Sequence, residues 1–269
     1  MAEAAPRPAG LSVVIPSYGR PSQLLEAVQS VATSYPDRTE ILVIDDATPG
    51  GPPADLPVRN DFQVPIRLYV QHRNRGPQAA RNLGIRRARF SHIAFLDADD
   101  RFMPDKIDRL LPLVTAGGWD LLFHPVIRME RAARIARWWN ASWRSVFGFR
   151  TLLCLLNPIA TPGLIVRRRC RLGIPTMRYA EDYAFLLRFA DPSIRVCFLD
   201  EALSAVGRAQ GSPGGLSADV RRMRKGEFLA RRVLLKRPSL GNLARWLLGS
   251  AVGLVRVASD IVRGRYVRG

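Results

Sequence analysis

One stretch of the chain, residues 92–100, runs from an apolar segment directly into three carboxylates. Residues 92–96 form a short, mostly apolar run, which is typical of a buried β-strand. Asp97, Asp99 and Asp100 follow within four positions, so they must lie where that strand leaves its sheet. Carboxylates crowded at one point repel one another unless a cation neutralises them. Their oxygen atoms suit Mg²⁺ or Mn²⁺, which proteins hold through one or two carboxylates together with substrate phosphates.

A solvated acidic turn near a helix start would explain the same residues without any ligand. A second strand argues against that interpretation, because the apolar run 40–44 also ends in two acids, Asp45 and Asp46. Strands and helices alternate here at the spacing of βαβ units, which predicts parallel strands covered on both faces. Their carboxyl ends then meet at one edge of the sheet, where ligands bind in open α/β proteins. Two independent strands therefore deliver carboxylates to one place.

The elements that position these residues are predicted from apolar periodicity and turn residues. Strands are expected at 11–16, 40–44, 66–70, 92–96, 119–124 and 161–166. Helices are expected at 22–34, after Gly76, from Pro104 to Gly117, after Glu181, and at 217–237 and 243–262. The Gly/Pro/Ser-rich segment 207–215 predicts a domain boundary. Neither a dinucleotide fingerprint after the first strand nor a P-loop motif is present, which excludes both of those nucleotide sites.

A second acidic pair, Glu181 and Asp182, directly precedes an apolar stripe at helical spacing. The pair therefore occupies the first turn of the predicted helix, where the macrodipole favours ionised carboxylates. A good helix start explains these acids without chemistry. An ionised carboxylate that faces a cleft can also act as a general base. The residues alone leave both interpretations open.

The charge of the chain is concentrated at its C-terminus. The 269 residues carry a formal net charge of +18, and residues 221–269 hold 13 lysines and arginines against only Glu227 and Asp260. Such a patch attracts anionic lipid, nucleic acid or a polyanionic substrate. No recognised nucleic-acid motif accompanies it, so a basic nucleic-acid-binding protein is the less favoured interpretation.

The predicted helix 243–262 has an uncharged core of only ten residues, Trp246 to Val255, whereas a membrane span needs about 20. The sequence instead predicts an amphipathic helix that lies in an anionic membrane interface through region 217–269. A helix packed onto its own domain or onto a partner chain is the alternative. The aromatic and arginine-rich stretch 128–150 is also open to two interpretations. Its side chains could stack on sugar or base rings or lie at a membrane interface, or its tryptophans could pack inward.

Two further features of the sequence bear on the cellular compartment of the protein. The three cysteines are scattered and show no CxxC spacing, which argues against a disulfide framework or a zinc site. Residues 1–6 lack a basic start followed by an apolar segment, unlike a signal peptide. The sequence therefore predicts a cytoplasmic protein that is peripheral on the inner face of the plasma membrane.

Five motifs occur in the order and approximate spacing of a known family. They are Val13-Val14-Ile15-Pro16-Ser17-Tyr18-Gly19-Arg20, Ile44-Asp45-Asp46, Asn74-Arg75-Gly76 with Ala80-Arg81-Asn82-Leu83-Gly84, Phe95-Leu96-Asp97-Ala98-Asp99-Asp100, and Glu181-Asp182. Over roughly residues 11–208 the chain resembles the inverting glycosyltransferases of family 2. The resemblance implies an α/β GT-A fold, with a Rossmann-like, mostly parallel sheet flanked by helices. The expected organisation is a flexible N-terminus (1–10), a GT-A domain (11–215) and a basic, amphipathic helical extension (216–269).

The resemblance also implies which residues bind a nucleotide-sugar donor. Pro16, Ser17 and Tyr18 would line the nucleoside pocket, after the first strand. Asp46 would hydrogen-bond the base, and Arg81 would lie near the diphosphate. A UDP-sugar is the favoured donor, and a hydroxyl of a glycan or lipid-linked molecule is the expected acceptor.

The metal and the base are implied in the same way. Asp97 and Asp99 match the family's DxD motif, which reaches the ribose and a divalent metal, and Asp100 is a neighbouring ligand. Asp182 corresponds to the catalytic base, with Glu181 as the alternative. Many relatives add a late histidine to the metal site, whereas the histidines of this chain all lie at or before position 124.

The expected activity is transfer of a sugar to a hydroxyl acceptor with inversion, in bacterial surface-polysaccharide or other glycan assembly. The carboxylates and the arginine suit this chemistry, because the leaving diphosphate needs its charge neutralised and the acceptor hydroxyl must lose a proton. A nucleotide-sugar-binding protein without transferase activity is the alternative, and the complete DxD and Glu-Asp pairs argue against it.

Overall fold

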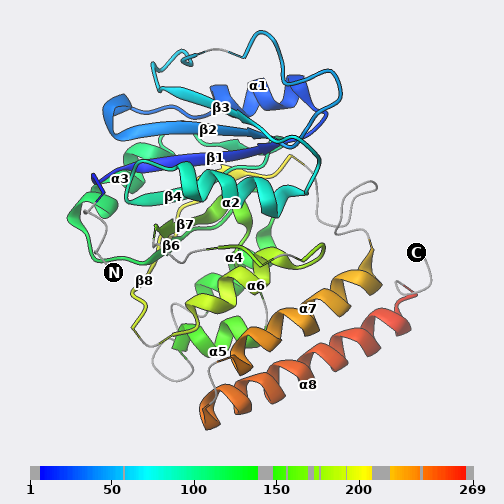
Figure 1. The fold of residues 1–269 in the computed structure, drawn as a ribbon. Helices are drawn as coiled ribbons and strands as arrows, with labels where there is room; N and C mark the ends of the chain where they lie inside the picture. Colours follow the sequence, from blue (N-terminus) through cyan, green and yellow to red (C-terminus); the bar gives the residue numbers. More distant parts are fainter. Residues whose placement is uncertain are drawn as a thin grey trace. The chain divides into compact units, whose positions relative to one another are not determined.

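The computed structural model describes residues 7–56, 58–138, 148–155, 157–168, 173–175, 177–191, 193–207, 219–236 and 239–264. The chain divides into two compact units that are interleaved in sequence (Figure 1). The first comprises Met1–Glu130, Ile159–Gly173 and Arg195–Gly207, and the second comprises Arg131–Pro158, Ile174–Ile194 and Arg208–Gly269. The division at residue 215 stays a prediction, and the compact units group the chain differently.

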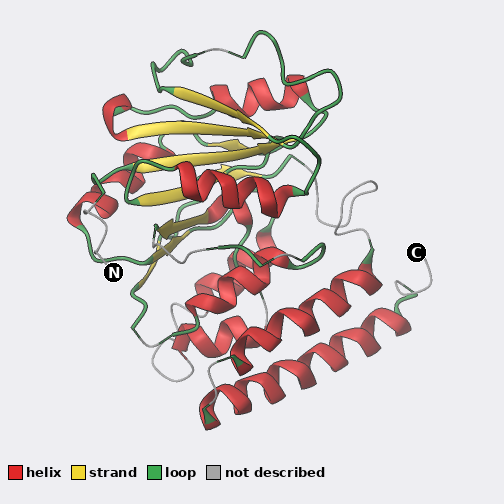
Figure 2. Cartoon of the chain, viewed as in Figure 1, coloured by secondary structure: helices red, strands yellow, loops and turns green. Residues whose placement is uncertain are grey.

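A seven-stranded sheet in the order β3-β2-β1-β4-β7-β6-β8 forms the framework of the first unit over its described residues (Figure 2). β1 pairs in parallel with β2 and β4, and β2 pairs in parallel with β3. β7 runs antiparallel to both of its neighbours, β4 and β6. The predicted mostly parallel sheet is therefore confirmed. The strands are β1 (Leu11–Ser17), β2 (Thr39–Asp45), β3 (Ile66–Val70), β4 (His92–Phe95), β6 (Leu121–Phe123), β7 (Leu164–Arg167) and β8 (Val196–Phe198).

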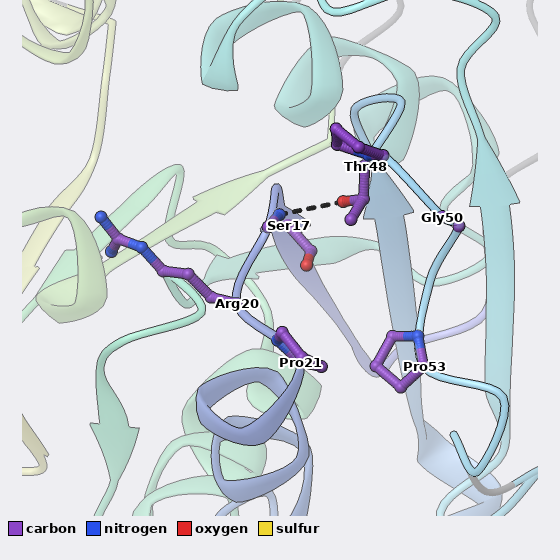
Figure 3. Close-up of a pocket in the computed structure, with 9 residues that line it drawn as sticks. Ser17, Arg20, Pro21, Thr48, Gly50 and Pro53 are labelled. Atoms are coloured by element: carbon purple, nitrogen blue, oxygen red, sulfur yellow. Dashed lines mark hydrogen bonds between the residues drawn. The ribbon is translucent and has the colours of Figure 1, made fainter.

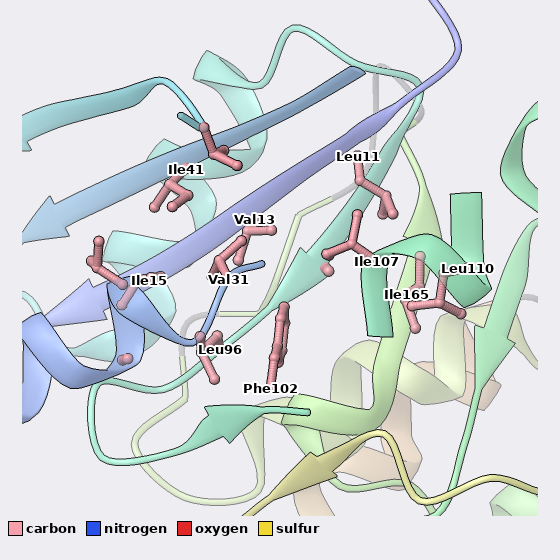
Figure 4. Close-up of a cluster of buried hydrophobic side chains, with 14 of the residues drawn as sticks. Leu11, Val13, Ile15, Val31, Ile41, Leu96, Phe102, Ile107, Leu110 and Ile165 are labelled. Carbon is pink, nitrogen blue, oxygen red and sulfur yellow. The ribbon is translucent and has the colours of Figure 1, made fainter. Parts of the chain in front are cut away.

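The two faces of this sheet are covered by different helices, because successive side chains of a strand point in opposite directions. Val13 of β1 lies in a buried cluster with residues of α1 (Pro21–Gln29) and α3 (Lys106–Ala116), part of which Figure 4 shows. Val14 points to the other face, where α2 (Pro77–Arg87) packs against it. Burial on both faces explains the continuous apolar runs Val13–Pro16 in β1 and Ile41–Ile44 in β2.

Short elements complete the first unit. A two-stranded sheet joins β5 (Arg101–Phe102) to β9 (Ser204–Ala205) in antiparallel pairing, so a segment late in the chain returns to the end of β4. The 3₁₀ helices are η1 (Pro36–Arg38) and η3 (Thr161–Gly163). The predicted strand at 161–166 thus begins with a 3₁₀ turn and becomes a strand only at Leu164.

Helix α1 is shorter than the 22–34 predicted from its apolar spacing, because the helix ends at Gln29. Val31 is still buried, but in the segment that follows the helix. The Asn60 side chain donates hydrogen bonds to the carbonyls of Val28 and Val31, at 3.4 and 2.6 Å. These long-range bonds satisfy carbonyls at the helix end that a continued helix would have used.

The second unit is helical over its described residues. Its last two helices, α7 and α8, run in opposite directions side by side (Figure 1). Asp219 caps α7 and Ser239 caps α8, each accepting from the amide three residues on. No helix in the described part of the chain is long and apolar enough to span a membrane. The elements are α4 (Glu130–Trp138), α5 (Gly148–Leu155), α6 (Glu181–Leu186), η4 (Leu187–Phe189), α7 (Val220–Leu235) and α8 (Leu240–Val262).

Gly84→Ala tests the contact between α2 and β1. A Cβ at Gly84 would lie 2.4 Å from Cγ1 of Val14, so the helix must move away from the strand. We expect unfolding free energy to fall by about 1–3 kcal/mol, as in other overpacked cores.

The matched control is Gly241→Ala, at an exposed position of α8 where the nearest atom is the flexible end of Arg245, at 3.2 Å. Alanine should leave stability unchanged or raise it by up to about 1 kcal/mol there. Urea unfolding of both variants measures the difference, and equal effects would contradict the close approach at Gly84.

Candidate functional site

The strand order of the sheet reverses between β1 and β4. The chain runs from β1 to β2 and β3 on one side and then returns to β4 on the other side of β1. Such a reversal is the topological switch point at which open α/β sheets bind ligands. The amide of Leu96 donates to the carbonyl of Val14 at 3.1 Å, so the two strands stay paired up to the point where the acidic turn begins.

A pocket of about 310 Å³ opens between the loops that follow β1 and β2 (Figure 3). Ser17 lines the pocket, whereas Pro16 is buried in β1 and Tyr18, 48% exposed, is not among the lining residues. Of the three residues predicted for the nucleoside pocket, Ser17 lines this cavity, and the binding role of all three stays a prediction. The lining consists of Ser17, Gly19, Arg20, Pro21, Thr48, Pro49, Gly50, Gly51 and Pro53.

Thr48 joins the two loops of the pocket. Its hydroxyl donates to Asp45 at 2.6 Å and accepts from the amide of Gly19 at 3.0 Å. Its own amide donates to the other oxygen of Asp45 at 3.0 Å. Asp45 is fully buried, and this side-chain turn holds the loop after β2 against the loop after β1. We did not predict this role for Asp45 and Thr48, although an Asp followed three residues later by Thr is a recognisable turn signal.

Asp46 organises the segment before α2. Its Oδ1 accepts from the side chain of Gln71 at 2.7 Å and from the amide of Arg75 at 2.8 Å. Its Oδ2 accepts from the amide of Gly76 at 2.7 Å. Burial raises the pKa of Asp46, and the amide hydrogen bonds from Arg75 and Gly76 oppose that rise. A carboxylate has about four acceptor positions, so three bonds leave room for one further donor.

The DxD carboxylates are each held by an arginine from a different element. Asp97 pairs with Nη2 of Arg81, on α2, at 2.5 Å. Asp99 pairs with Nη1 of Arg20, in the loop after β1, also at 2.5 Å. In Figure 3 the Arg20 side chain extends away from Thr48 and Pro53 on the other side of the pocket. The structure thus brings Arg81 to Asp97 and adds Arg20, from the motif after β1, at Asp99. The binding roles of these residues stay predictions.

Asp100 lies deeper than its two neighbours and is only 6% exposed. Its Oδ1 accepts from the amide of Gly207 at 3.0 Å. Burial, followed by the negative charge of Asp97, raises the pKa of Asp100 to about 7. A Cβ at Gly207 would lie 1.8 Å from the carbonyl oxygen of Asp99, so the late segment touches the acidic turn with its backbone. The segment late in the chain therefore contributes a backbone amide, that of Gly207, beside the acids.

A buried lysine supports the strand pair that carries Gly207. Nζ of Lys106 donates to the carbonyl of Pro162 at 2.6 Å and to the hydroxyl of Ser204 at 3.0 Å. It also lies 3.5 Å from the centre of the Phe102 ring. Complete burial lowers the pKa of Lys106, and Asp100 opposes that shift. The sequence gives no signal for the burial of Lys106, because a lysine at the start of a helix is expected to be exposed to solvent.

The donor set of the acidic turn fits a divalent ion that is shared with a ligand. Asp97, Asp99 and Asp100 offer only oxygen atoms, the type that Mg²⁺ and Mn²⁺ prefer. Within the described ranges, no three His, Cys, Asp or Glu side chains gather as a ready-made metal site. The residues therefore suit an ion held by one or two carboxylates and by phosphate oxygens, and they do not form a closed cage.

The second unit carries the other predicted acids. Asp182 is partly exposed, and its Oδ2 accepts from Nδ2 of Asn157 at 3.1 Å. Glu181 is buried, at 8% exposure, so Asp182 is the acid of the pair that solvent reaches more easily. Ala180 precedes both with φ +56°, a left-handed conformation that costs energy for a residue with a side chain.

Tyr183, next to Asp182, fixes α6 to the end of α5. Its hydroxyl donates to the carbonyls of Leu153 and Cys154 at 2.7 and 3.0 Å. Nε of Arg231, on α7, donates to the same carbonyl of Cys154 at 3.0 Å. These carbonyls belong to the last turn of α5, which lacks intrahelical donors. The position of Asp182 therefore depends on three helices of its own unit.

The comparisons with known proteins agree with this geometry. The family model described as Glycosyl transferase family 2 matches residues 12–165, more than half of the chain. The chain belongs to glycosyl transferase family 2. An uncharacterized glycosyltransferase of Rickettsia conorii is 41% identical over 99 residues, which are 36% of this chain and 16% of that relative. The succinoglycan biosynthesis protein ExoO of Rhizobium meliloti is 34% identical over 108 residues, 40% of this chain and 30% of that protein. The matches thus span less than a third of these relatives.

Solved structures share the fold. The S. aureus protein TarS, in complex with UDP-GlcNAc, has a TM-score of 0.63 at 16% identity, covering 90% of this chain and 71% of TarS. A mannosyltransferase from Pyrobaculum calidifontis, in complex with GDP-Man and Mn²⁺, has a TM-score of 0.64 at 15% identity. That match covers 97% of this chain and 82% of the mannosyltransferase. The predicted GT-A fold of this family 2 chain is confirmed.

Asp46→Asn tests the organising role of Asp46. An asparagine amide would place a donor where the carboxylate now accepts from backbone amides. We expect stability to fall by about 1–3 kcal/mol, the range for a buried hydrogen-bonding group left without a partner. Hydrogen exchange at the amides of Arg75 and Gly76 should accelerate with it. The exposed Asp61→Asn is the control, and unchanged exchange at both amides would contradict the role.

Proposed function

We propose that this family 2 chain transfers a sugar from a nucleotide-diphosphate donor to a hydroxyl acceptor, with inversion at the anomeric carbon. The observation that carries the proposal is the meeting of Arg20 and Arg81 with the DxD carboxylates at the β1–β4 switch point. A leaving diphosphate carries negative charge, and cations fixed in advance at its site stabilise that charge in the transition state.

The donor would bind across the loops that follow β1 and β2. The pocket beside Ser17 and Thr48 would take the nucleoside, and the remaining acceptor position of Asp46 would meet a donor group of the base. UDP-sugars remain the favoured donors. TarS bound to UDP-GlcNAc supports this preference, and the mannosyltransferase bound to GDP-Man makes GDP-sugars the alternative to be tested.

Asp99, with Asp97 or Asp100, would hold a divalent ion, Mg²⁺ or Mn²⁺. When bound, the ion would neutralise the charge of the diphosphate as a Lewis acid. Arg20 would leave Asp99 for a phosphate oxygen, because its side chain is 35% exposed and can turn without burying a charge. Arg81 would stay paired with Asp97, since the Arg81 side chain, on α2, is only 7% exposed.

Asp182 would act as the base that takes the proton from the acceptor hydroxyl. Its greater exposure than Glu181 and its hydrogen bond from Asn157 support this choice, because a base must be both reachable and fixed. A single base acting on the face opposite the leaving group gives inversion. The likeness to ExoO supports a place in bacterial surface-polysaccharide assembly, with a glycan or lipid-linked acceptor.

Asp182→Asn tests the base. The amide keeps the shape of the side chain but cannot accept the proton, so turnover of the donor should fall roughly 10²- to 10⁴-fold. Nucleotide binding, followed by thermal shift, should not change. Asp191→Asn, in the same unit, is the control. If Asp182→Asn retains activity and Glu181→Gln loses it, the role belongs to Glu181.

Asp99→Asn tests the metal. A ligand that binds only the folded chain raises its melting temperature, so UDP or GDP should raise it further when Mn²⁺ is present. The variant should lose this Mn²⁺-dependent part of the shift, whereas Asp61→Asn should keep it. A shift of equal size in Asp99→Asn would remove Asp99 from the ligand set.

A further inference from the structure

The solvent-facing side of helix α8 is apolar along its whole length. Exposed leucines include Leu240 at 89%, Leu247 at 55% and Leu254 at 62%. At about 100° per residue the exposed positions cover roughly 160° of the helix circumference. None of them carries a charge or a polar side chain. They are Leu240, Gly241, Leu243, Ala244, Leu247, Leu248, Ala251, Leu254, Val255, Ala258, Ile261 and Val262.

The polar stripe of α8 is turned inward instead. A Cβ at Gly249 would lie 2.4 Å from the carbonyl oxygen of Cys154, and one at Gly253 would lie 3.0 Å from Phe228, so these two glycines bring α8 close to α5 and α7. Two charged residues of the stripe, Arg256 and Asp260, form ion pairs with residues of α7. This arrangement leaves the apolar side of the helix facing outward.

Ion pairs within the hairpin remove its acids from the surface. Arg224 of α7 pairs with Asp260 of α8 at 2.8 Å and with Glu227 at 2.8 Å. Arg256 of α8 pairs with the second oxygen of Glu227 at 2.9 Å. Glu227 and Asp260 are 12% and 6% exposed as side chains, so both contribute little negative charge to the outside.

Over residues 219–236 and 239–264 the fully exposed charges are all positive. Asp219, at the start of α7, is 30% exposed as a side chain and pairs with Arg222 at 3.2 Å. The exposed positive charges lie mainly on α7, whose axis is about 10 Å from that of a packed neighbour. An apolar helix face beside a row of cations matches the two layers of an anionic membrane surface, the acyl boundary and the headgroups. The exposed cations are Arg221, Arg222, Lys225, Arg232, Lys236 and Arg263.

A second copy of the chain fits this face less well. Paired helices bury a narrow seam and place charged residues on its two flanks, where they set register and orientation. The α8 face carries Leu248 and Val255 toward one flank and Leu243 and Ile261 on the other instead. A contiguous apolar patch of this width is rare on a monomer and indicates a binding surface.

We propose that α8 lies flat in the interface of an anionic lipid bilayer, with its apolar face in the acyl boundary and the cations of α7 on the headgroups. This is the partner that the sequence predicted for region 217–269. The structure adds which face is inserted and which residues meet the headgroups. The inference does not depend on the proposed transfer reaction, because binding to lipid is measured without donor or acceptor.

Co-sedimentation of the full chain with vesicles tests the proposal. Wild type should bind vesicles of phosphatidylglycerol and phosphatidylcholine and should bind pure phosphatidylcholine much more weakly, since each exposed cation adds attraction to anionic lipid. The double variant L247E/L254E should weaken binding to the anionic vesicles roughly 10- to 100-fold, because two leucines no longer enter the apolar layer. K225Q/R232Q should weaken it about tenfold and should make it less sensitive to salt.

The control V58E/F62E replaces two exposed apolar residues of the first unit, which are 81% and 46% exposed, and should bind as wild type does. L248E/V255E, on the same face of α8, repeats the test if the first variant unfolds, as judged by its melting temperature. Binding by L247E/L254E and L248E/V255E as tight as wild type would overturn the proposal. So would a dimer in vesicle-free solution that these variants convert to monomer, because the face would then belong to a second copy.

Discussion

The crowding of buried and partly buried carboxylates at one edge of the sheet is the constraint on which the site depends. β2 ends at Asp45 and Asp46, and β4 leads into Asp97, Asp99 and Asp100, so parallel pairing with β1 brings five acids to neighbouring strand ends. Buried negative charges are tolerated only with donors or cations beside them. Each acid has such a partner, and the partners come from four other segments of the chain. The loops around the sheet edge are therefore held by the acids themselves.

These partners differ in how easily a ligand could replace them. Asp45 and Asp46 are bound by Thr48 and by backbone amides, which are part of the loop structure and cannot leave without unfolding it. Asp99 is bound by a half-exposed arginine, Arg20, that can turn to another anion. The sheet edge thus combines a rigid side, which shapes the pocket after β1 and β2, with an exchangeable ion pair where a diphosphate would arrive. This division suits a site that must bind and release a charged group in each cycle.

The second unit satisfies its charges in the opposite way. Glu227 and Asp260 are paired with arginines inside the α7–α8 hairpin, and the two glycines of α8 allow the helices to approach. The acids Glu227 and Asp260 are paired internally, and the apolar face of α8 is left outside. In the first unit the apolar residues form the core and the acids gather at one edge of the sheet. The two units therefore present different chemistry to their surroundings, a polar pocket in one and an apolar helix face bordered by cations in the other.

The sequence by itself determined the alternation of strands and helices, the family and the residues of the DxD turn, because strand burial and motif spacing are local properties of the chain. It also placed Arg81 near the acids. Only the tertiary structure decided the partners of those acids, since Arg20 and Gly207 meet the turn through contacts between segments as many as 107 positions apart. It also buried Lys106 against Ser204, 98 positions away. It likewise decided that α8 turns its charged stripe inward, because a helical pattern defines two faces and only packing chooses which one is covered.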